Sequence, residues 1–414
     1  MELVDGLWQL VNQMREIIVS QWKLLHLHTQ AGRTQTETNS TTDSQLGEVE
    51  ETDLFLQYDF IIKALGAIET SQGDPQVVYP LLQENLELLD EAFGSMLHIW
   101  IITVLTKANS EQIKVIATLI NKFCDLICDF SLDNSVNKLE IAINGYEAVL
   151  KVMNPDSYPE IWADAQFGCG KSYRRREQGE EADNLEQAIV AFQQALRVYS
   201  IEDTPQKWAS THYRLGVIYY KRTCGERSEN LDRAIAFLEG ALRAYSSNNI
   251  SKDWANIQYW LGVVYSERLN GDRVENQEKA IHACEQALVG YDWAYLKDRA
   301  DTQYWLATIY DARLNGDRVE NQEKAIHLCE QALKVYYEDY PKNQADTQYL
   351  LATIYYERLQ GNKAENQDKA LSLLKETLGV YSPEDFPKDW ADVQYWFGVV
   401  YSERLNGDRV ENQE

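Results

Sequence analysis

The amino-acid sequence predicts an all-α solenoid, built from a stack of antiparallel helix hairpins. A motif returns every 45 or 46 residues from about residue 136 onward, and within each unit the apolar residues follow the period of a helix. The composition agrees, because 21 glycines and 8 prolines among 414 residues are too few for a collagen-like or disordered chain. One hairpin cannot bury its own apolar faces, so the units must stack.

The first helix of each unit, which we name helix A, is marked by the dipeptide Trp-Ala or a substitute for it. Eight residues after the start of this anchor lies a glycine or an alanine, and eleven residues after it lies a tyrosine. The small residue lets a second helix approach closely, while large residues fill the grooves between hairpins. The anchors are Trp162-Ala163, Trp208-Ala209, Trp254-Ala255, Arg299-Ala300, Gln344-Ala345 and Trp390-Ala391.

The second helix, helix B, is predicted to begin at an asparagine. Asparagine is a favoured N-cap, and acidic residues follow it in the first turn, as in Asn276-Gln277-Glu278. An alanine comes four residues later and an aromatic residue comes near the end of the run, which gives the helix one buried face. The asparagines are Asn184, Asn230, Asn276, Asn321, Asn366 and Asn412.

The turn between the two helices has its own signature. An arginine precedes a glycine by three residues, and an acidic residue follows four residues after the glycine, as in Arg268, Gly271 and Glu275. We expect the glycine to supply a left-handed helix stop and the arginine to bind the acidic residue across the turn. Because every unit repeats this set, the signature indicates a structural device rather than an active site.

These residues resemble tetratricopeptide repeats (TPR), which have Leu-Gly-x-x-Tyr on helix A and two alanines around a large residue on helix B. The stretch Leu215-Gly216-Val217-Ile218-Tyr219, with Ala234, Leu238 and Ala241, matches that pattern. A TPR unit has about 34 residues. The longer units here resemble the TPR arrays that precede CHAT (caspase-like) protease domains in bacteria, and are loosely similar to kinesin light chain repeats. The resemblance covers about 136–414 and implies a right-handed superhelix whose concave surface is lined by helices A.

The chain divides into four regions. Residues 1–30 form an amphipathic helix, for which docking or self-association is preferred to membrane binding because its polar face is not strongly basic. Residues 31–52 are polar and predict a flexible linker. Residues 53–135 form a divergent helical region, and residues 136–414 form the solenoid with its last repeat incomplete. The helices expected in the divergent region are 54–70, 75–93, 95–107 and 111–130.

Charge and hydropathy exclude several classes of function. The net charge of −26 repels nucleic acid and anionic membrane surfaces. No stretch is apolar enough for a membrane span, and the chain opens without the basic segment of a signal peptide. We therefore expect a cytoplasmic protein that contacts neither nucleic acid nor membrane. Its six cysteines suit reduced, mostly buried thiols better than a disulfide framework.

Catalysis needs chemical groups that converge, and the sequence offers none with the right spacing. Residues two apart on a helix point in different directions, and a single cysteine pair lacks the second ligand pair of a zinc site. We expect a buried thiol beside a partly exposed histidine, and no enzyme activity, metal or cofactor. The sets considered are His282-x-Cys284, its repeat His327-x-Cys329, and the pair Cys124 and Cys128.

The geometry of the family places the fifth residue after each anchor on the concave surface. These residues form a predicted aromatic column that binds a protein or peptide partner, namely Phe167, Tyr213, Tyr259, Tyr304, Tyr349 and Tyr395. The alternative is that the rings pack against the neighbouring helix A. The acidic candidates on the same surface, which would favour a basic or mixed partner, are Asp301, Asp346, Asp392, Glu357 and Glu403.

The first repeat differs, because Lys171, Arg174, Arg175 and Arg176 follow one another along a single helix. This cluster could contact a carboxylate or an acidic segment of a partner. The alternative is that it neutralises the nearby acidic residues Glu177, Glu180 and Glu181.

The sequence stops at Asn412-Gln413-Glu414, where helix B of the sixth repeat is expected to begin. Either a longer protein continues, for which the resemblance implies a CHAT-type protease, or a partner or second copy meets this open C-terminal face. The preferred function is a non-catalytic interaction scaffold. The alternatives are the sensor arm of a proteolytic effector and a receptor for a signalling peptide or small ligand.

Overall fold

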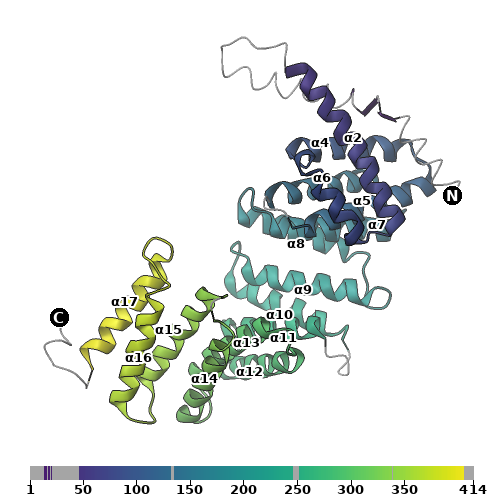
Figure 1. The fold of residues 1–414 in the computed structure, drawn as a ribbon. Helices are drawn as coiled ribbons and strands as arrows, with labels where there is room; N and C mark the ends of the chain where they lie inside the picture. The colour runs from purple at the N-terminus through teal and green to yellow at the C-terminus, as the bar shows by residue number, and fades with distance from the viewer. Residues whose placement is uncertain are drawn as a thin grey trace. The chain divides into compact units, whose positions relative to one another are not determined.

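The computed structural model describes residues 14, 15, 17, 18, 20, 46–131, 135–245, 251–337 and 339–404. Within these residues the secondary structure is helical, with no strand, and each helix packs on its neighbours along the chain. The chain is therefore an all-α solenoid, as predicted. It divides into an N-terminal unit, Met1–Thr211, and a C-terminal unit, His212–Glu414, which are described separately below (Figure 1).

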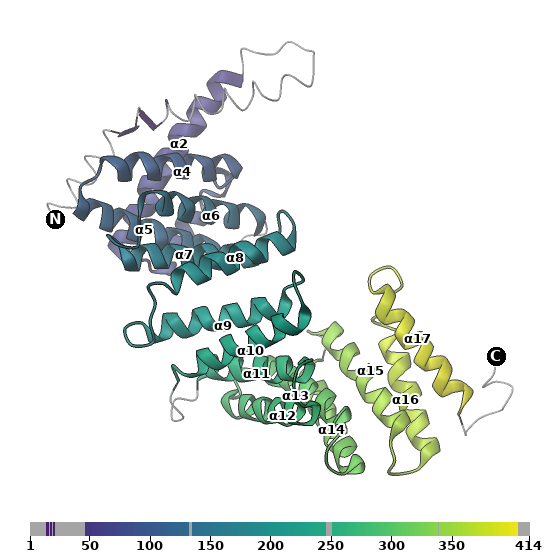
Figure 2. The same cartoon turned by 180° about the vertical axis from the view of Figure 1, so that it is seen from behind.

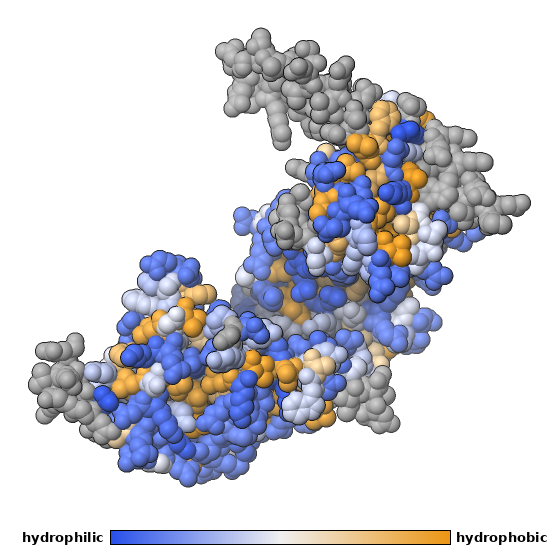
Figure 3. All heavy atoms as spheres, in the orientation of Figure 1, coloured by the Kyte–Doolittle hydropathy of each residue, from blue (hydrophilic) through white to orange (hydrophobic). Residues whose placement is uncertain are grey.

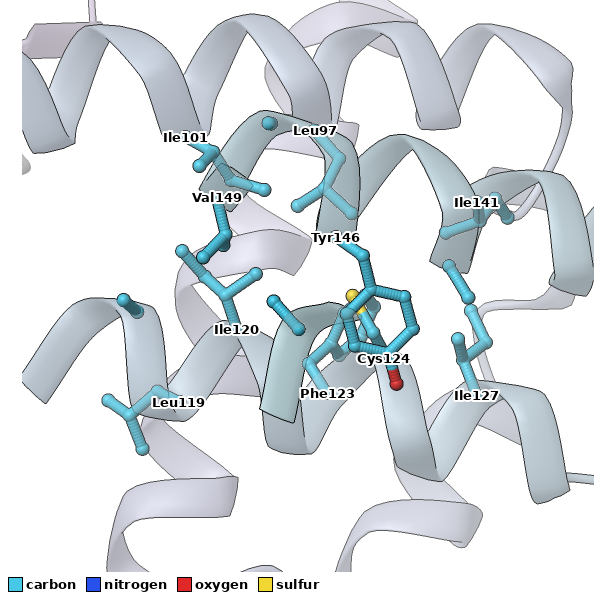
Figure 4. Close-up of a cluster of buried hydrophobic side chains, with 14 of the residues drawn as sticks. Leu97, Ile101, Leu119, Ile120, Phe123, Cys124, Ile127, Ile141, Tyr146 and Val149 are labelled. Atoms are coloured by element: carbon cyan, nitrogen blue, oxygen red, sulfur yellow. The ribbon is translucent and has the colours of Figure 1, made fainter. Parts of the chain in front are cut away.

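The N-terminal unit is organised around α6, which packs against α4, α5 and α7. Its large core draws apolar side chains from α2 to α8. Figure 4 shows part of this core, where Leu97 and Ile101 of α4, Ile120 and Cys124 of α5 and Tyr146 of α6 meet. The helices of this unit are α2 (Leu46–Ser71), α3 (Pro75–Gln83), η1 (Leu86–Leu88), α4 (Glu91–Lys107), α5 (Ser110–Asp129), α6 (Ser135–Val152), α7 (Pro159–Arg175), α8 (Glu181–Ala195) and the first part of α9 (Pro205–Lys221).

The single helix expected over 75–93 is wrong, because the structure breaks it into α3, the short η1 and the start of α4. Asp90 is the N-cap of α4, and its carboxylate accepts a hydrogen bond from the Phe93 backbone N–H at 2.8 Å. The Gln57 side chain fixes the break by donating to Asp90 Oδ1 at 3.1 Å. The cap at Asp90 thus starts a new helix inside the expected run, and its partner Gln57 lies on another helix.

Only part of the expected N-terminal helix and linker can be compared with the structure. Residues 46–52, placed in the linker by the sequence, are the first turns of α2, and the linker before them lies outside the described residues. Within 1–30, Ile18 is fully buried in the core of the N-terminal unit. Arg15 donates to Asp59 of α2 at 3.0 Å, so this segment docks on its own chain. Self-association through it stays a prediction.

The C-terminal unit is a stack of hairpins in which each helix packs on the next and each helix A also contacts the following helix A (Figure 2). Close approach within a hairpin is visible at Gly262, where an added Cβ would lie 2.2 Å from Cys284 Sγ. After the remainder of α9, the helices are α10 (Arg227–Leu242), α11 (Lys252–Glu267), α12 (Arg273–Gly290), α13 (Leu296–Asp311), α14 (Arg318–Leu333), α15 (Pro341–Glu357), α16 (Lys363–Thr377) and α17 (Pro387–Ser402).

The asparagines are not the N-caps of helices B, which corrects the sequence prediction. In α14 the N-cap is Asp317, whose carboxylate accepts from the Glu320 backbone N–H at 2.9 Å. Asn321 lies one turn inside the helix, where it is buried and reaches back to the turn. Its Nδ2 donates to the Asn315 carbonyl at 2.9 Å, and its Oδ1 accepts from Arg313 Nη1 at 3.2 Å.

The turn glycines are left-handed as predicted, with φ of +84° at Gly271 and +81° at Gly316. They lie in the middle of the turn, because helix A has already ended four or five residues earlier. The arginine does not bind the acidic residue across its own turn. Instead Arg313 makes two hydrogen bonds, of 2.9 and 2.8 Å, to Glu278 on the preceding helix B. It therefore ties one hairpin to the next.

The glutamine that precedes the paired acidic residue, Gln277 before Glu278 and Gln322 before Glu323, makes a second tie that the sequence analysis did not identify. Gln322 is buried on α14, where its Nε2 donates to the Glu357 carbonyl at 3.0 Å and its Oε1 accepts from the Leu359 backbone N–H at 3.1 Å. Gln277 makes the same pair of bonds to Ala312 and Leu314. Helix B thus satisfies backbone groups left unpaired at the end of the next helix A.

Candidate partner-binding surface

The predicted aromatic column lies on helices A, and the C-terminal unit brings four of its members onto consecutive helices. Tyr259, Tyr304, Tyr349 and Tyr395 occupy equivalent positions on α11, α13, α15 and α17, whose neighbours in this order are in contact. The first three are half-buried, whereas Tyr395 is 67% exposed. We call this set the tyrosine column.

Rings of the tyrosine column also contact the neighbouring helix A, which is the arrangement that the alternative prediction describes. The Trp305 indole of the next helix A hydrogen-bonds to Tyr259, and Trp396 does the same for Tyr349. Burial, with Asp346 nearby, raises the pKa of Tyr304 to about 12, so this hydroxyl stays protonated at neutral pH. Tyr259 and Tyr349 thus each contact the next helix A while they stay partly exposed.

The remaining two members lie on α7 and α9. Phe167 belongs to the N-terminal unit, where its ring packs edge-on against Phe192 and Tyr199 with centroid separations of 5.6 and 6.3 Å. Tyr213 is half-buried on α9, at the start of the C-terminal unit.

Tryptophans next to the tyrosines enlarge the aromatic surface and were missed by the sequence analysis. The ring of Trp260 lies edge-on to Tyr259 at a centroid distance of 5.5 Å, and Trp396 lies edge-on to Tyr395 at 5.9 Å. A Tyr-Trp dipeptide at the same position in three of the last four repeats was the available signal. Figure 3 shows apolar side chains gathered between polar ones over the helices of this unit.

The acidic candidates on helices A are mostly engaged within the protein. Asp301 accepts from the Tyr336 hydroxyl at 2.6 Å and from Lys297 at 2.7 Å. Asp346 is bound in the same way by Tyr381 and Lys342. Charge on this surface is thus partly compensated by lysines.

The other three acidic candidates are more exposed, and Glu357 and Glu403 lie at the C-terminal ends of their helices. Glu357 pairs with Arg318 at 3.3 Å, and Glu403 accepts from the Tyr356 hydroxyl at 2.8 Å. Asp392 is exposed on α17.

Three residues of the basic cluster in the first repeat are paired internally with carboxylates of α5 and α6. Lys171 lies 3.3 Å from Asp125, and Arg175 donates to Asp129 at 3.0 Å, both on α5. Arg176 binds Glu140 of α6. Arg174 lies half-buried on the same helix. The residues Glu177, Glu180 and Glu181 are not the partners in these pairs.

The histidine and cysteine sets do not form a reactive site. Cys284 and Cys329 are fully buried, and burial raises the pKa of the Cys284 thiol to about 12, so it stays protonated and unreactive at neutral pH. His282 and His327 point to solvent. Across the part of the chain that the structure describes, no three His, Cys, Asp or Glu side chains are grouped as a metal site would need.

No family model matches the chain, and no curated protein matches it. Among the described helices none has the length and apolar character that crossing a membrane requires.

Proposed function

We propose that the chain is a non-catalytic scaffold that binds a protein or peptide on its helix-A surface in the C-terminal unit. The observation that carries this proposal is the tyrosine column, repeated at one position on four successive helices A and accompanied by tryptophans. Aromatic rings supply large contact areas at low entropic cost and carry a polar group for orientation. A stack of identical positions suits an extended peptide or a partner helix.

The electrostatics of the surface support a partner of basic or mixed charge. Asp392 is exposed, Glu403 is bound only through a tyrosine hydroxyl in the contacts above, and the whole chain carries a net charge of −26. Complementary charge mainly raises the association rate and excludes acidic competitors.

We also infer that the hairpins are tetratricopeptide repeats of the long form that precedes CHAT-type proteases, and that the protein works in the cytoplasm. The close contact of Gly262 with Cys284 supports the first inference, because the family pattern puts a small residue of helix A against helix B. The buried, unpaired thiols fit a reducing compartment.

The test blocks the surface without removing its packed rings. Thr308 and Thr353 lie half-buried on α13 and α15, four residues after Tyr304 and Tyr349. Their hydroxyls donate to nearby carbonyls of their own helices, and the Thr308 hydroxyl also hydrogen-bonds to the Tyr304 side chain. The double variant Thr308→Arg, Thr353→Arg fills the surface and reverses its charge. We expect a partner captured from the host lysate to bind at least about tenfold more weakly when it is then titrated as a purified protein.

The matched control is the double variant His282→Arg, His327→Arg, which adds the same side chains on the exposed side of α12 and α14. It should bind the partner as the parent does. If the Thr308→Arg, Thr353→Arg variant binds the partner as tightly as the parent, and circular dichroism shows that both are folded, the helix-A surface is excluded as the binding site.

A further inference from the structure

A polar pocket lies in the C-terminal unit where the turn between α11 and α12 meets α10. Its volume is about 480 Å³. No member of the tyrosine column lines it, so it is separate from the helix-A surface of the proposed function. We call it the turn pocket, and its lining includes Arg227, Leu231, Glu267, Leu269 and Arg273.

The turn pocket lies where the glutamine tie between hairpins is missing. Helices α12, α14 and α16 carry a buried glutamine at this position, and its Nε2 donates to a carbonyl at the end of the next helix A. The Oε1 atoms of Gln277 and Gln322 also accept from a backbone N–H of the following turn. Helix α10 carries Leu231 instead, and a leucine side chain can neither donate nor accept a hydrogen bond.

The missing tie leaves one backbone acceptor and one backbone donor in the pocket lining. They are the Glu267 carbonyl and the Leu269 N–H, and across the described residues no protein group hydrogen-bonds to either. Glu267 is the last residue of α11, so its carbonyl has no partner within the helix. This pair is complementary to a carboxamide, which donates through its nitrogen and accepts through its oxygen.

The turn pocket also contains an arginine that lacks the carboxylate found at the equivalent places in the stack. The residue that matches this carboxylate is Ala312, and within the described part of the chain the Arg273 guanidinium donates only to the Ser266 carbonyl, at 2.6 Å. Its charge is therefore available to an anionic group. In the hairpins before and after, the equivalent pairs are Arg227–Glu267 at 2.7 Å and Arg318–Glu357 at 3.3 Å.

We propose that the turn pocket binds a peptide segment of a partner protein that carries a glutamine or asparagine side chain close to an acidic side chain. The carboxamide donates to the Glu267 carbonyl and accepts from the Leu269 N–H, as Gln277 does at the equivalent atoms one hairpin later. The acidic side chain pairs with Arg273. The Glu267 carboxylate is already bound by Arg227 and by the Tyr220 hydroxyl, each at 2.7 Å, which limits its repulsion of the ligand.

The test uses variants that close the pocket with side chains the chain already has in other repeats. Leu231→Gln gives α10 the amide of the later helices B, and Ala312→Glu gives Arg273 the carboxylate of its neighbours. A displayed library of random short peptides is first depleted on the double variant and then selected on the full chain. We expect enriched peptides to share Gln or Asn near Asp or Glu. By calorimetry, each single variant should bind them at least about tenfold more weakly than the parent.

Two control variants should bind the selected peptides as the parent does. Leu359→Gln adds the same carboxamide at a residue that is 66% exposed in another turn. The Thr308→Arg, Thr353→Arg variant blocks the helix-A surface, so failure of this proposal can be distinguished from failure of the proposed function. Ala312 is exposed, so Ala312→Glu still tests the pocket if circular dichroism shows that Leu231→Gln disturbs the fold.

Three results would overturn the proposal. The first is that no peptide is enriched on the folded parent. The second is that the enriched peptides bind Ala312→Glu as tightly as the parent. The third is that free glutamine at about 1 mM displaces them, because the pocket would then take a small molecule rather than a peptide segment.

Discussion

Asn321 shows how one side chain can fix a whole turn between helices. It is 2% exposed, and its amide joins the Asn315 carbonyl to the Arg313 guanidinium. Asn276 and Asn366 make the same two bonds one repeat earlier and later. Only a side chain with a donor and an acceptor on neighbouring atoms can do this, so aspartate could not replace it.

Replacing Asn321 with alanine should therefore lower the free energy of unfolding of the C-terminal unit by about 1–3 kcal/mol, because a buried carbonyl and a guanidinium lose their partner. Urea denaturation followed by circular dichroism would measure the loss. Leu314→Ala provides the control, since that side chain is 67% exposed in the same turn. Its cost should stay within about 0.5 kcal/mol. Equal losses in the two variants would contradict the role assigned to Asn321.

At the scale of the element, three consecutive residues of helix B stabilise different parts of the stack. In Asn321-Gln322-Glu323, the asparagine hydrogen-bonds to the turn of its own hairpin. The glutamine and the glutamate hydrogen-bond to the next hairpin. Gln322 bonds backbone groups at the end of α15, and Glu323 receives two hydrogen bonds of 2.7 Å from Arg358. The hairpins that carry Gln277, Gln322 and Gln367 are thus attached to the next helix A by one amide and one paired carboxylate.

These ties make the stack sensitive to acid. The hydrogen bonds from Arg313 hold the pKa of Glu278 below its ordinary value of 4.5. A carboxylate with a lowered pKa in the folded state adds stability above 4.5, and this stability is lost as the pH falls through the folded pKa. The thermal midpoint of the parent should fall between about pH 5 and pH 3, and Glu278→Gln should flatten that fall.

A titration of the midpoint by differential scanning calorimetry would test this acid dependence. Lys324 pairs with the exposed Glu320 at the start of α14, so Glu320→Gln is a matched control that leaves the hairpin tie intact. If both variants follow the parent curve, the Arg313–Glu278 pair does not contribute to the acid response.

The hairpins could be predicted from the sequence because their period, anchors and small residues are local or regularly spaced. The hydrogen-bond partners of the turn residues could not be predicted. Arg313 binds a residue 35 positions earlier, on another hairpin, and only stacking brings the two together. The asparagine was read as an N-cap because Asp317 and Asn321 are both good N-caps four residues apart, and propensity does not choose between them. The register of the tyrosine column was predictable, but its half-buried state depends on Trp305 and Trp396 of the following helices.

At the scale of the whole molecule, the chain contains 25 tyrosines together with 65 acidic and 39 basic residues. In each unit, buried tyrosine hydroxyls donate to carboxylates, as Tyr173 does to Glu147 at 2.7 Å and Tyr336 to Asp301 at 2.6 Å. A neutral donor stabilises a carboxylate without adding a cation. The acidic surface can thus remain charged while each paired carboxylate still has a hydrogen-bond partner.

This arrangement predicts unfolding in alkali. Burial and the neighbouring Glu285 raise the pKa of Tyr310 to about 12, and burial raises that of Tyr304 to about 12 as well, from an ordinary value of 10.0. A group whose pKa is raised in the folded state contributes its full stability below 10.0, and this contribution is lost as the pH rises toward 12. Helix content should fall in that window together with the appearance of tyrosinate absorbance, and Tyr310→Phe should shift the transition upward. If the tyrosinate absorbance that Tyr310→Phe removes from the parent already forms near pH 10 while the helices persist, the Tyr310 hydroxyl is not protected by the fold.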